Sequence, residues 1–84
     1  MPYIKIERRI ELNTRRSMPE DAGELNYLFT TIANEYLTRK GVRYQHINDL
    51  IGALEGAKLE LYRRVAVPYE DKKKEENRDV YSCI

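Results

Sequence analysis

Cysteine, tryptophan and long hydrophobic runs are scarce or missing in this chain, and each absence narrows the class of protein. The single cysteine, Cys83, cannot form a disulfide within the chain, so the sequence does not indicate an oxidising compartment. No segment approaches the roughly 18 consecutive apolar residues of a membrane span. The first residues, MPYIKIERRIEL, also lack the apolar core of a signal peptide. We therefore expect a cytoplasmic protein without a membrane partner.

An excess of one charge is also missing. The 84 residues include 15 Lys and Arg against 14 Asp and Glu, a formal net charge of +1. Proteins that bind nucleic acid usually show a strongly basic balance, so nucleic acid is not an expected partner. Charged residues still make up 35% of the chain and the mean hydropathy is −0.72, so the core must be thin. Because small cores often depend on oligomerisation, we expect a homo-oligomer.

One amphipathic helix is expected over residues 21–40. Its apolar residues recur at spacings of three and four and form one stripe: Leu25, Leu28, Phe29, Ile32, Ala33, Tyr36 and Leu37. Ser17 and Asp21 compete as the residue that caps its start. Gly41 supplies a left-handed stop at its end.

A second helix is expected over residues 44–66. Its apolar residues fall on a single face that we expect to be buried: Ile47, Leu50, Ile51, Leu54, Ala57, Leu61 and Val65. We expect this helix to end before Pro68, because proline has no N–H donor and restricts the residue that precedes it. The short link of residues 41–43 favours antiparallel neighbours. The predicted fold class is therefore all-α, an antiparallel two-helix hairpin.

Two further segments flank this hairpin within a single predicted domain, residues 1–84. Residues 1–16 fit either a strand or a short helix by their apolar spacing, and we predict the helix. Residues 67–84 are mostly charged or polar and predict an irregular, solvated tail, with room for a helical turn between residues 70 and 79. Val80 and Tyr81 return to apolar character near its end, so we expect them to contact a neighbouring surface.

Gly52 and Gly56 lie one turn apart in the second predicted helix, on a different side from its apolar face. Each costs roughly 0.8–1 kcal/mol relative to alanine in a helix interior. They either allow another helix to approach closely or leave room for a planar ligand between subunits. The first interpretation is favoured because this small-residue spacing is common. Both interpretations place an interface at these glycines.

Basic and aromatic residues gather where the second predicted helix ends, and we take them as candidate ligand-binding residues: Lys58, Tyr62, Arg63, Arg64 and Tyr69. The planar fork of arginine can hold phosphate through two hydrogen bonds, and tyrosine can stack on a base. An equally weighted alternative is that the arginines compensate the helix dipole and form surface ion pairs with Glu60 and Glu70. Adjacent helical positions diverge by about 100°, so we expect at most one arginine to face a given cavity.

Other arginine pairs and the single histidine carry less information. We interpret Arg8-Arg9 and Arg15-Arg16 as exposed helix charge. His46 is the only histidine, and a structural role is expected for it. The sequence has no cysteine or histidine pairs at metal-ligand spacing and no GxxxxGK phosphate loop. We therefore expect no enzymatic activity, no metal and no cofactor.

Two blocks of the sequence resemble a family of small uncharacterised proteins from bacteriophages and environmental sequences. The blocks are NYLFTTIANEYLTRKG, followed after two residues by YQHINDLIGALEGAKLELYRRV, and then VPYEDKKKEENRDVY. Family members begin with MPYI and end in YRRVxxPYEDKKxEENGDVY, so the resemblance covers residues 1–4 and 25–81. This chain has Arg78 where the family usually has glycine, and it adds Ser82, Cys83 and Ile84. The resemblance implies no particular activity.

A looser similarity extends to the helical-hairpin phage sponge proteins that counter CBASS and Thoeris defences. It consists of a late aromatic residue, a nearby arginine and a following proline, here in the run LYRRVAVP of residues 61–68. Sponge proteins are homo-oligomers that sequester nucleotide second messengers between subunits without cleaving them. The similarity therefore implies an anti-defence protein, in the cytoplasm of a host cell, that binds a cyclic nucleotide or an ADP-ribose-type ligand.

The alternative prediction is a small helical protein-interaction module without a small-molecule ligand. Such a module would use the surfaces at Gly52 and Gly56 and at Val80 and Tyr81 to inhibit or bridge a protein of the host.

Overall fold

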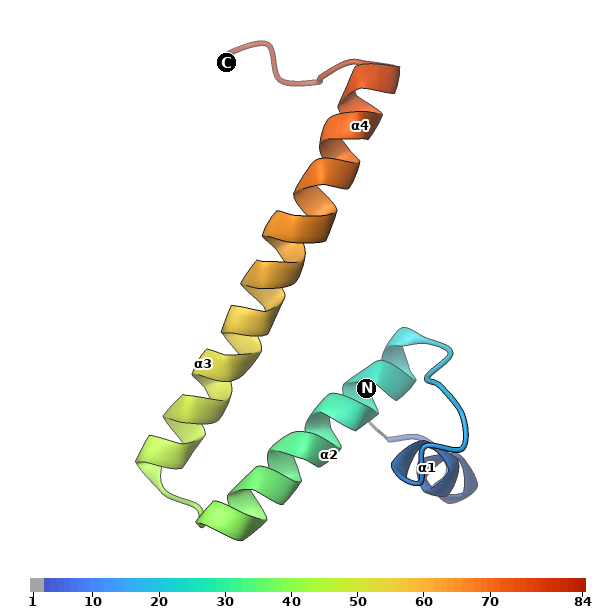
Figure 1. The fold of residues 1–84 in the computed structure, drawn as a ribbon, viewed down its shortest axis with the longest axis vertical. Coiled ribbons are helices and arrows are strands. Elements are labelled where there is room, and N and C mark those ends of the chain that lie inside the picture. The colour runs from blue at the N-terminus through green and yellow to red at the C-terminus, as the bar shows by residue number, and fades with distance from the viewer. Residues whose placement is uncertain (1–2) are drawn as a thin grey trace. The chain divides into compact units, whose positions relative to one another are not determined.

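The computed structural model describes residues 3–84, which form helices and loops without any strand. The elements are α1 (Ile6–Asn13), α2 (Ala22–Lys40), α3 (Tyr44–Leu61), a π-helical turn η1 (Tyr62–Ala66) and α4 (Val67–Asn77) (Figure 1). The all-α prediction is confirmed. No helix in this range is long and apolar enough to cross a membrane. Of the predicted N-terminal segment, residues 1 and 2 lie outside the described range.

The chain divides into two compact units, Met1–Ile47 and Asn48–Ile84. In the first unit, α1 contacts α2. Leu12 of α1 is fully buried and Leu28 of α2 is 9% exposed, and they are the only buried apolar side chains within residues 3–84. Burial of a leucine side chain contributes about 1.5–3 kcal/mol, so this core is small. The antiparallel hairpin of the two long helices stays a prediction.

Asp21, and not Ser17, caps the start of α2. Its Oδ1 accepts a hydrogen bond of 2.9 Å from the backbone N–H of Glu24. At the other end, Gly41 has a φ of +97° and donates its N–H to the carbonyl oxygen of Leu37 at 2.8 Å. A positive φ is accessible to glycine without the steric cost that a side chain would bring. The helix thus begins and ends within one residue of the range expected from its sequence.

His46 stabilises the turn between α2 and α3. Its Nδ1 lies 2.8 Å from the carbonyl oxygen of Gly41. Because a carbonyl can only accept a hydrogen bond, the Nδ1 atom must carry the proton. The imidazole also meets the ring of Tyr36 edge-on, with centroids 6.3 Å apart. These contacts give His46 the structural role expected for it.

The prediction that the second helix ends before Pro68 is wrong. The helical backbone continues from α3 through η1 into α4 and ends at Asn77 (Figure 1). In η1 the N–H of Val67 donates to the carbonyl oxygen of Tyr62, five residues back. In a regular α-helix, the proline ring would clash with the carbonyl four residues back, that of Arg64. The wider π turn accommodates Pro68, so the irregular tail shortens to residues 78–84.

The apolar face of α3 has the predicted spacing, but it is not buried as expected. No residue of α3 is buried, and the exposed fractions reach 60% for Ile51 and 61% for Leu61. Within the unit Asn48–Ile84, the contact between elements is the one that joins α4 to the adjoining η1. The apolar face therefore has no partner within its own unit.

Candidate ligand-binding site

The five predicted ligand-binding residues lie along one continuous stretch of helix. Tyr62, Arg63 and Arg64 belong to η1, Tyr69 lies in the first turn of α4, and Lys58 lies in the last turn of α3. All five are exposed, and the arginine side chains are 71% and 76% exposed. They form an open surface, which we call the η1 cluster.

Arg63 and Arg64 converge on one carboxylate. Nη2 of Arg63 donates to Oε2 of Glu60 at 2.9 Å, and Nη1 of Arg64 donates to Oε1 of Glu60 at 3.3 Å. Both guanidinium groups thus reach one exposed carboxylate, and the expectation that at most one of them faces a given cavity stays a prediction. Their long side chains overcome the angle between adjacent helical positions, since arginine extends a flexible apolar stem beneath its charged group. The predicted ion pair with Glu60 is confirmed.

The η1 cluster retains positive charge despite this pairing. Two guanidinium groups share one carboxylate, so one positive charge is left uncompensated at Glu60. Lys58 is itself paired with Glu55, at 3.7 Å. Exposed ion pairs of this kind contribute about 0.2–1 kcal/mol each, so an anion can compete for the arginines at small cost.

Tyr62 and Tyr69 add aromatic surface to the cluster. Tyr62 is 54% exposed and Tyr69 is 61% exposed. Nζ of Lys73 lies 5.6 Å from the centroid of the Tyr69 ring, a distance at which a cation is attracted to the ring face. Exposed aromatic rings of this type can stack on a base.

Gly52 and Gly56 face open space. A Cβ atom built on either glycine meets no atom within 4 Å among the residues of the described chain. At 100° per residue, the pair lies on the opposite side of α3 from Ile51 and Leu54. The interface predicted at these glycines, and the contact predicted for Val80 and Tyr81, stay predictions.

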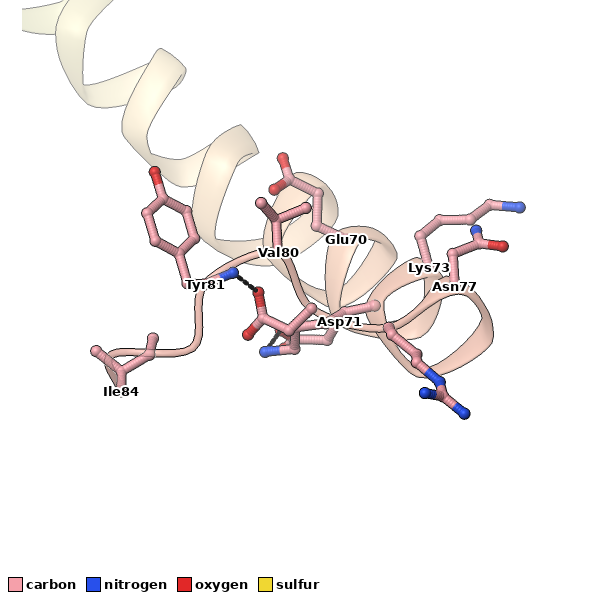
Figure 2. A pocket seen from close by; sticks show the side chains of 10 residues that line it. Glu70, Asp71, Lys73, Asn77, Val80, Tyr81 and Ile84 are labelled. Carbon is pink, nitrogen blue, oxygen red and sulfur yellow. Dashed lines mark hydrogen bonds and ion pairs between the residues drawn. The ribbon is translucent and has the colours of Figure 1, made fainter.

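A hollow that the sequence did not predict lies between α4 and the tail, with a volume of about 480 Å³ (Figure 2). Val80, Tyr81 and Ile84 line one side, and the backbone N–H of Tyr81 donates to Oδ1 of Asp79 at 2.9 Å. Lys73 and Lys74 on the α4 side are engaged by Glu76 and Asp71, at 3.3 and 3.5 Å. This hollow depends on the continuation of the helix beyond Pro68, so the expected irregular tail concealed it.

Arg78 ends α4 in a backbone conformation that suits glycine. Its φ is +71° and its ψ is +151°. This region is almost confined to glycine, and it costs another residue about 1–3 kcal/mol. The family resemblance noted in the sequence analysis implies glycine at this position, and the backbone of Arg78 offers a physical reason for that expectation.

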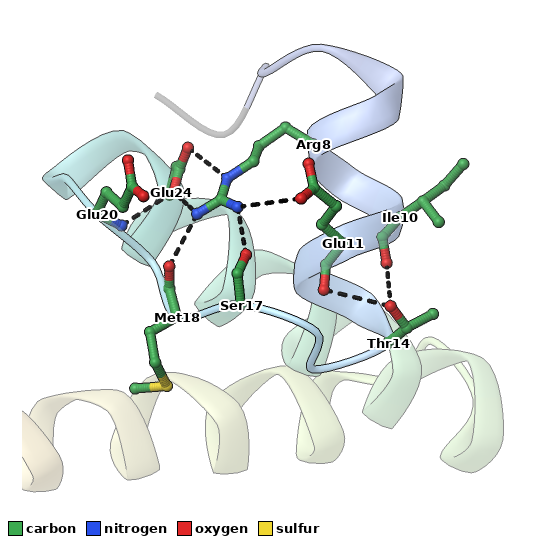
Figure 3. A network of polar contacts seen from close by, with 8 residues as sticks. All are labelled: Arg8, Ile10, Glu11, Thr14, Ser17, Met18, Glu20 and Glu24. Atoms are coloured by element: carbon green, nitrogen blue, oxygen red, sulfur yellow. Dashed lines mark hydrogen bonds and ion pairs between the residues drawn. The ribbon is translucent and has the colours of Figure 1, made fainter.

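Arg8 is not the exposed helix charge that the sequence indicated. It connects α1 to the start of α2 and to the loop between them (Figure 3). Nε and Nη2 donate to the two carboxylate oxygens of Glu24 at 2.7 and 2.6 Å, Nη2 also donates to the carbonyl oxygen of Met18 at 2.8 Å, and Nη1 contacts Ser17. The side chains of Arg8 and Glu24 are only 18% and 13% exposed.

These hydrogen bonds shift the acid–base properties of both partners. The bonds from Arg8, and then one of 2.9 Å from the backbone N–H of Glu20, hold the pKa of Glu24 below its usual range. The same pairing with Glu24 raises the pKa of Arg8 further above its already high value. The arrangement stabilises both charged forms and acts as a structural clasp. A single sequence provides no signal that would pair residues 16 positions apart in this way.

These features define a small helical protein that displays charged and aromatic side chains on an exposed helix. Residues 3–84 contain no group of three or more histidine, cysteine, aspartate or glutamate side chains that could hold a metal ion. The family model described as "Domain of unknown function (DUF6899)" matches residues 1–80, and the chain belongs to this family. The predicted membership of a family of uncharacterised proteins is confirmed. No curated protein and no solved structure matches the chain.

Proposed function

We propose that this protein is a non-enzymatic anti-defence protein of phage type, which self-associates and sequesters a nucleotide-derived signalling molecule. The observation that carries the proposal is the convergence of Arg63 and Arg64 on Glu60 beside two exposed tyrosines. The pattern combines phosphate-binding groups with aromatic surface within about three helical turns.

Glu60 prepares the arginines for an anionic ligand. It holds both guanidinium groups near one position before the ligand arrives, which reduces the side-chain freedom lost on binding. A phosphate group presents more acceptor oxygens than a carboxylate and can take two parallel hydrogen bonds from each guanidinium. Phosphate therefore displaces Glu60 from the same N–H groups.

Tyr62 or Tyr69 then supplies the contact with the base. Stacking of a base on an aromatic side chain contributes about 1–3 kcal/mol and tolerates different bases. A ligand with two or more phosphates and bases, such as a cyclic di- or trinucleotide, gains from both kinds of contact. An ADP-ribose derivative offers the same two groups.

A second copy is needed to enclose this ligand. Small-molecule sites usually bury about 70–90% of the ligand surface, which the open η1 cluster of one chain does not provide. A second protomer supplies the opposite wall. This requirement links the proposed binding to the homo-oligomer expected from the small core.

Calorimetric titration of the assembled wild-type protein against cyclic di- and trinucleotides and ADP-ribose derivatives tests the proposal. We expect saturable heat with at least one of them, and its loss in the double variant Arg63→Ala/Arg64→Ala. The matched control is Arg39→Ala/Lys40→Ala, which removes the same charge from the exposed end of α2 and should bind as the wild type does. The absence of heat with every ligand would refute the proposed function.

A second candidate function is favoured by the exposed apolar face of α3. A protein-interaction module would use such a face, or the surfaces at Gly52 and Gly56 and at Val80 and Tyr81, to bind a host protein. A partner that stays bound after nuclease treatment and removal of nucleotides, and that is released by a substitution on one of these surfaces, would favour this function over sequestration.

A further inference from the structure

We infer that Arg63 and Arg64 of one chain bind a single dianionic phosphate unit, and that this preference selects the ligand. The unit carries two negative charges on one terminal phosphate, or on two phosphates that share an oxygen as in a pyrophosphate. The inference rests on the proposed function for the kind of ligand, and within that function it favours ADP-ribose derivatives over cyclic di- and trinucleotides.

The two guanidinium groups meet at one position. Nη2 of Arg63 lies 2.9 Å from Oε2 of Glu60, and Nη1 of Arg64 lies 3.3 Å from Oε1 of the same side chain. The two oxygens of a carboxylate are bonded to one carbon, so they are close neighbours, as two oxygens of one phosphate are. A single dianionic phosphate unit can therefore contact both arginines where Glu60 now contacts them.

Cyclic di- and trinucleotides do not present such a unit. Their phosphates are separated from one another by a ribose, and each is a diester with a single negative charge. Only one of these phosphates can take the place of Glu60 between Arg63 and Arg64. The other phosphates gain no contact from this arginine pair.

The charge at the arginine pair also favours a dianion. Two guanidinium groups share the one carboxylate of Glu60, which leaves a positive charge uncompensated. A diester brings no more charge than the carboxylate it displaces, and it must compete with a group tethered to the same helix and hence present at a high effective concentration. A terminal phosphate carries about 1.5–2 negative charges at neutral pH and brings the further charge that the pair can use.

Both arginines have donors left for the additional oxygens of such a unit. Glu60 accepts from one nitrogen of Arg63 and from one nitrogen of Arg64. Because a guanidinium group has five N–H donors, most of them stay available to a ligand. The two side chains are 71% and 76% exposed, so a ligand can reach them from solvent.

Calorimetric titration of the assembled wild-type protein with matched ligands tests the preference. AMP and 3′,5′-cyclic AMP share the base, the ribose and a single phosphate, but only AMP has a dianionic phosphate at neutral pH. We expect AMP to bind at least about fivefold more tightly, the effect in water of one added unit charge about 4 Å from an opposite charge. Equal or reversed affinities would overturn the inference.

ADP-ribose and cyclic di-AMP form the second matched pair, because each carries two phosphates. In ADP-ribose the phosphates share an oxygen, whereas in cyclic di-AMP a ribose separates them. We expect ADP-ribose to bind more tightly, and tighter binding of cyclic di-AMP would overturn the inference. Comparison of ADP-ribose with AMP then shows whether the preferred unit is a pyrophosphate or a terminal phosphate.

Nuclear magnetic resonance with inorganic pyrophosphate tests the arginine pair without a base. The Nε–H signals of Arg63 and Arg64 should shift together with one common dissociation constant, because both contact the same unit. Arg39, which is exposed in the last turn of α2, is the internal control and should not shift with them. A shift of only one of the pair, or two different dissociation constants, would overturn the inference.

Glu60→Gln tests whether the pyrophosphate takes the place of Glu60. The glutamine removes the competing charge and keeps an oxygen that accepts from the arginines, so we expect about fivefold tighter binding of pyrophosphate. Glu75→Gln is the matched control, because Glu75 is exposed and lies about 22 Å along the helix, beyond the screening distance of about 8–10 Å. Unchanged or weaker binding in Glu60→Gln would overturn the inference.

These outcomes separate the inference from the proposed function. Pyrophosphate that binds at both arginines, with no heat from any nucleotide, would leave the inference intact and refute the proposed function. Cyclic dinucleotides that bind more tightly than ADP-ribose would refute the inference and support the proposed function. A protein that binds neither pyrophosphate nor nucleotides would refute both.

Discussion

Arg8 and Glu24 join α1 to α2 through two parallel hydrogen bonds of 2.7 and 2.6 Å, from Nε and Nη2 of the guanidinium to the two carboxylate oxygens. Paired charges in this bidentate geometry are among the stronger polar contacts in proteins. Leu12 and Leu28 are the only buried apolar side chains in residues 3–84, so polar contacts such as this clasp help to hold α1 on α2.

The first prediction is that acid weakens this unit through Glu24. The pKa of Glu24 is lower in the folded protein than in the unfolded chain, where it is about 4.3, because Arg8 and the N–H of Glu20 stabilise the carboxylate. The resulting stability is complete at neutral pH and is lost as the pH falls below the unfolded value and through the folded one. Arg8 stays protonated throughout, so its own raised pKa adds no dependence in this range.

Thermal denaturation of the wild type and of Glu24→Gln at neutral and acidic pH measures this effect. We expect a lower melting temperature for the variant at pH 7 and a difference that narrows as the pH falls through the lowered pKa of Glu24. Glu11→Gln is the matched control, because Glu11 is 52% exposed and lies 3.9 Å from Arg8. A difference between wild type and Glu24→Gln that persists unchanged in acid would contradict the prediction.

The second prediction concerns Arg78. Arg78→Gly should stabilise the end of α4 by about 1 kcal/mol, because glycine adopts the observed positive φ without strain. Asn77→Gly should have the opposite effect, since Asn77 is still helical and glycine is unfavourable there. Amide hydrogen exchange in the last turn of α4 measures both changes. Protection in Arg78→Gly that does not exceed that of the wild type would contradict the relief of strain at Arg78.

The third prediction is that Pro68→Ala raises helicity. A proline within a helix costs about 3 kcal/mol or more, and the π turn removes only part of this cost. Without proline, the regular α-helical hydrogen bonds can form across residues 62–68. Circular dichroism measures the change. Val67→Ala keeps Pro68 and is the control; parallel changes in both variants would argue against the role assigned to the proline.

The sequence pattern predicted α2 and the start of α3 well. The spacing from Leu25 to Leu37 and the glycine at position 41 predict α2 almost to the residue. Both signals, the helical spacing and the glycine whose positive φ ends the helix, depend only on residues that are close together in the sequence. The same holds for the start of α3 at Tyr44. The basic and aromatic composition of the η1 cluster could also be predicted from the sequence, because residues that are close together along a helix are also close in space.

The sequence did not show which apolar helix faces are covered by other residues. The apolar face of α3 has the spacing of a core face, yet periodicity shows only that residues share a side of the helix and not what covers that side. The clasp between Arg8 and Glu24 was missed for a related reason. Its partners come together only after α1 folds onto α2, and many other charged residues in the chain would have been equally acceptable partners by spacing.

Local residue chemistry alone determined that this chain is helical, where α2 begins and ends, and which basic and aromatic side chains gather near Pro68. The three-dimensional arrangement decided that the backbone passes the proline through a π turn, that both arginines reach Glu60, and that Arg78 adopts a glycine-like conformation. These features depend on competition between hydrogen bonds, ring clashes and side-chain reach, whose outcome is settled only when all the atoms are placed together.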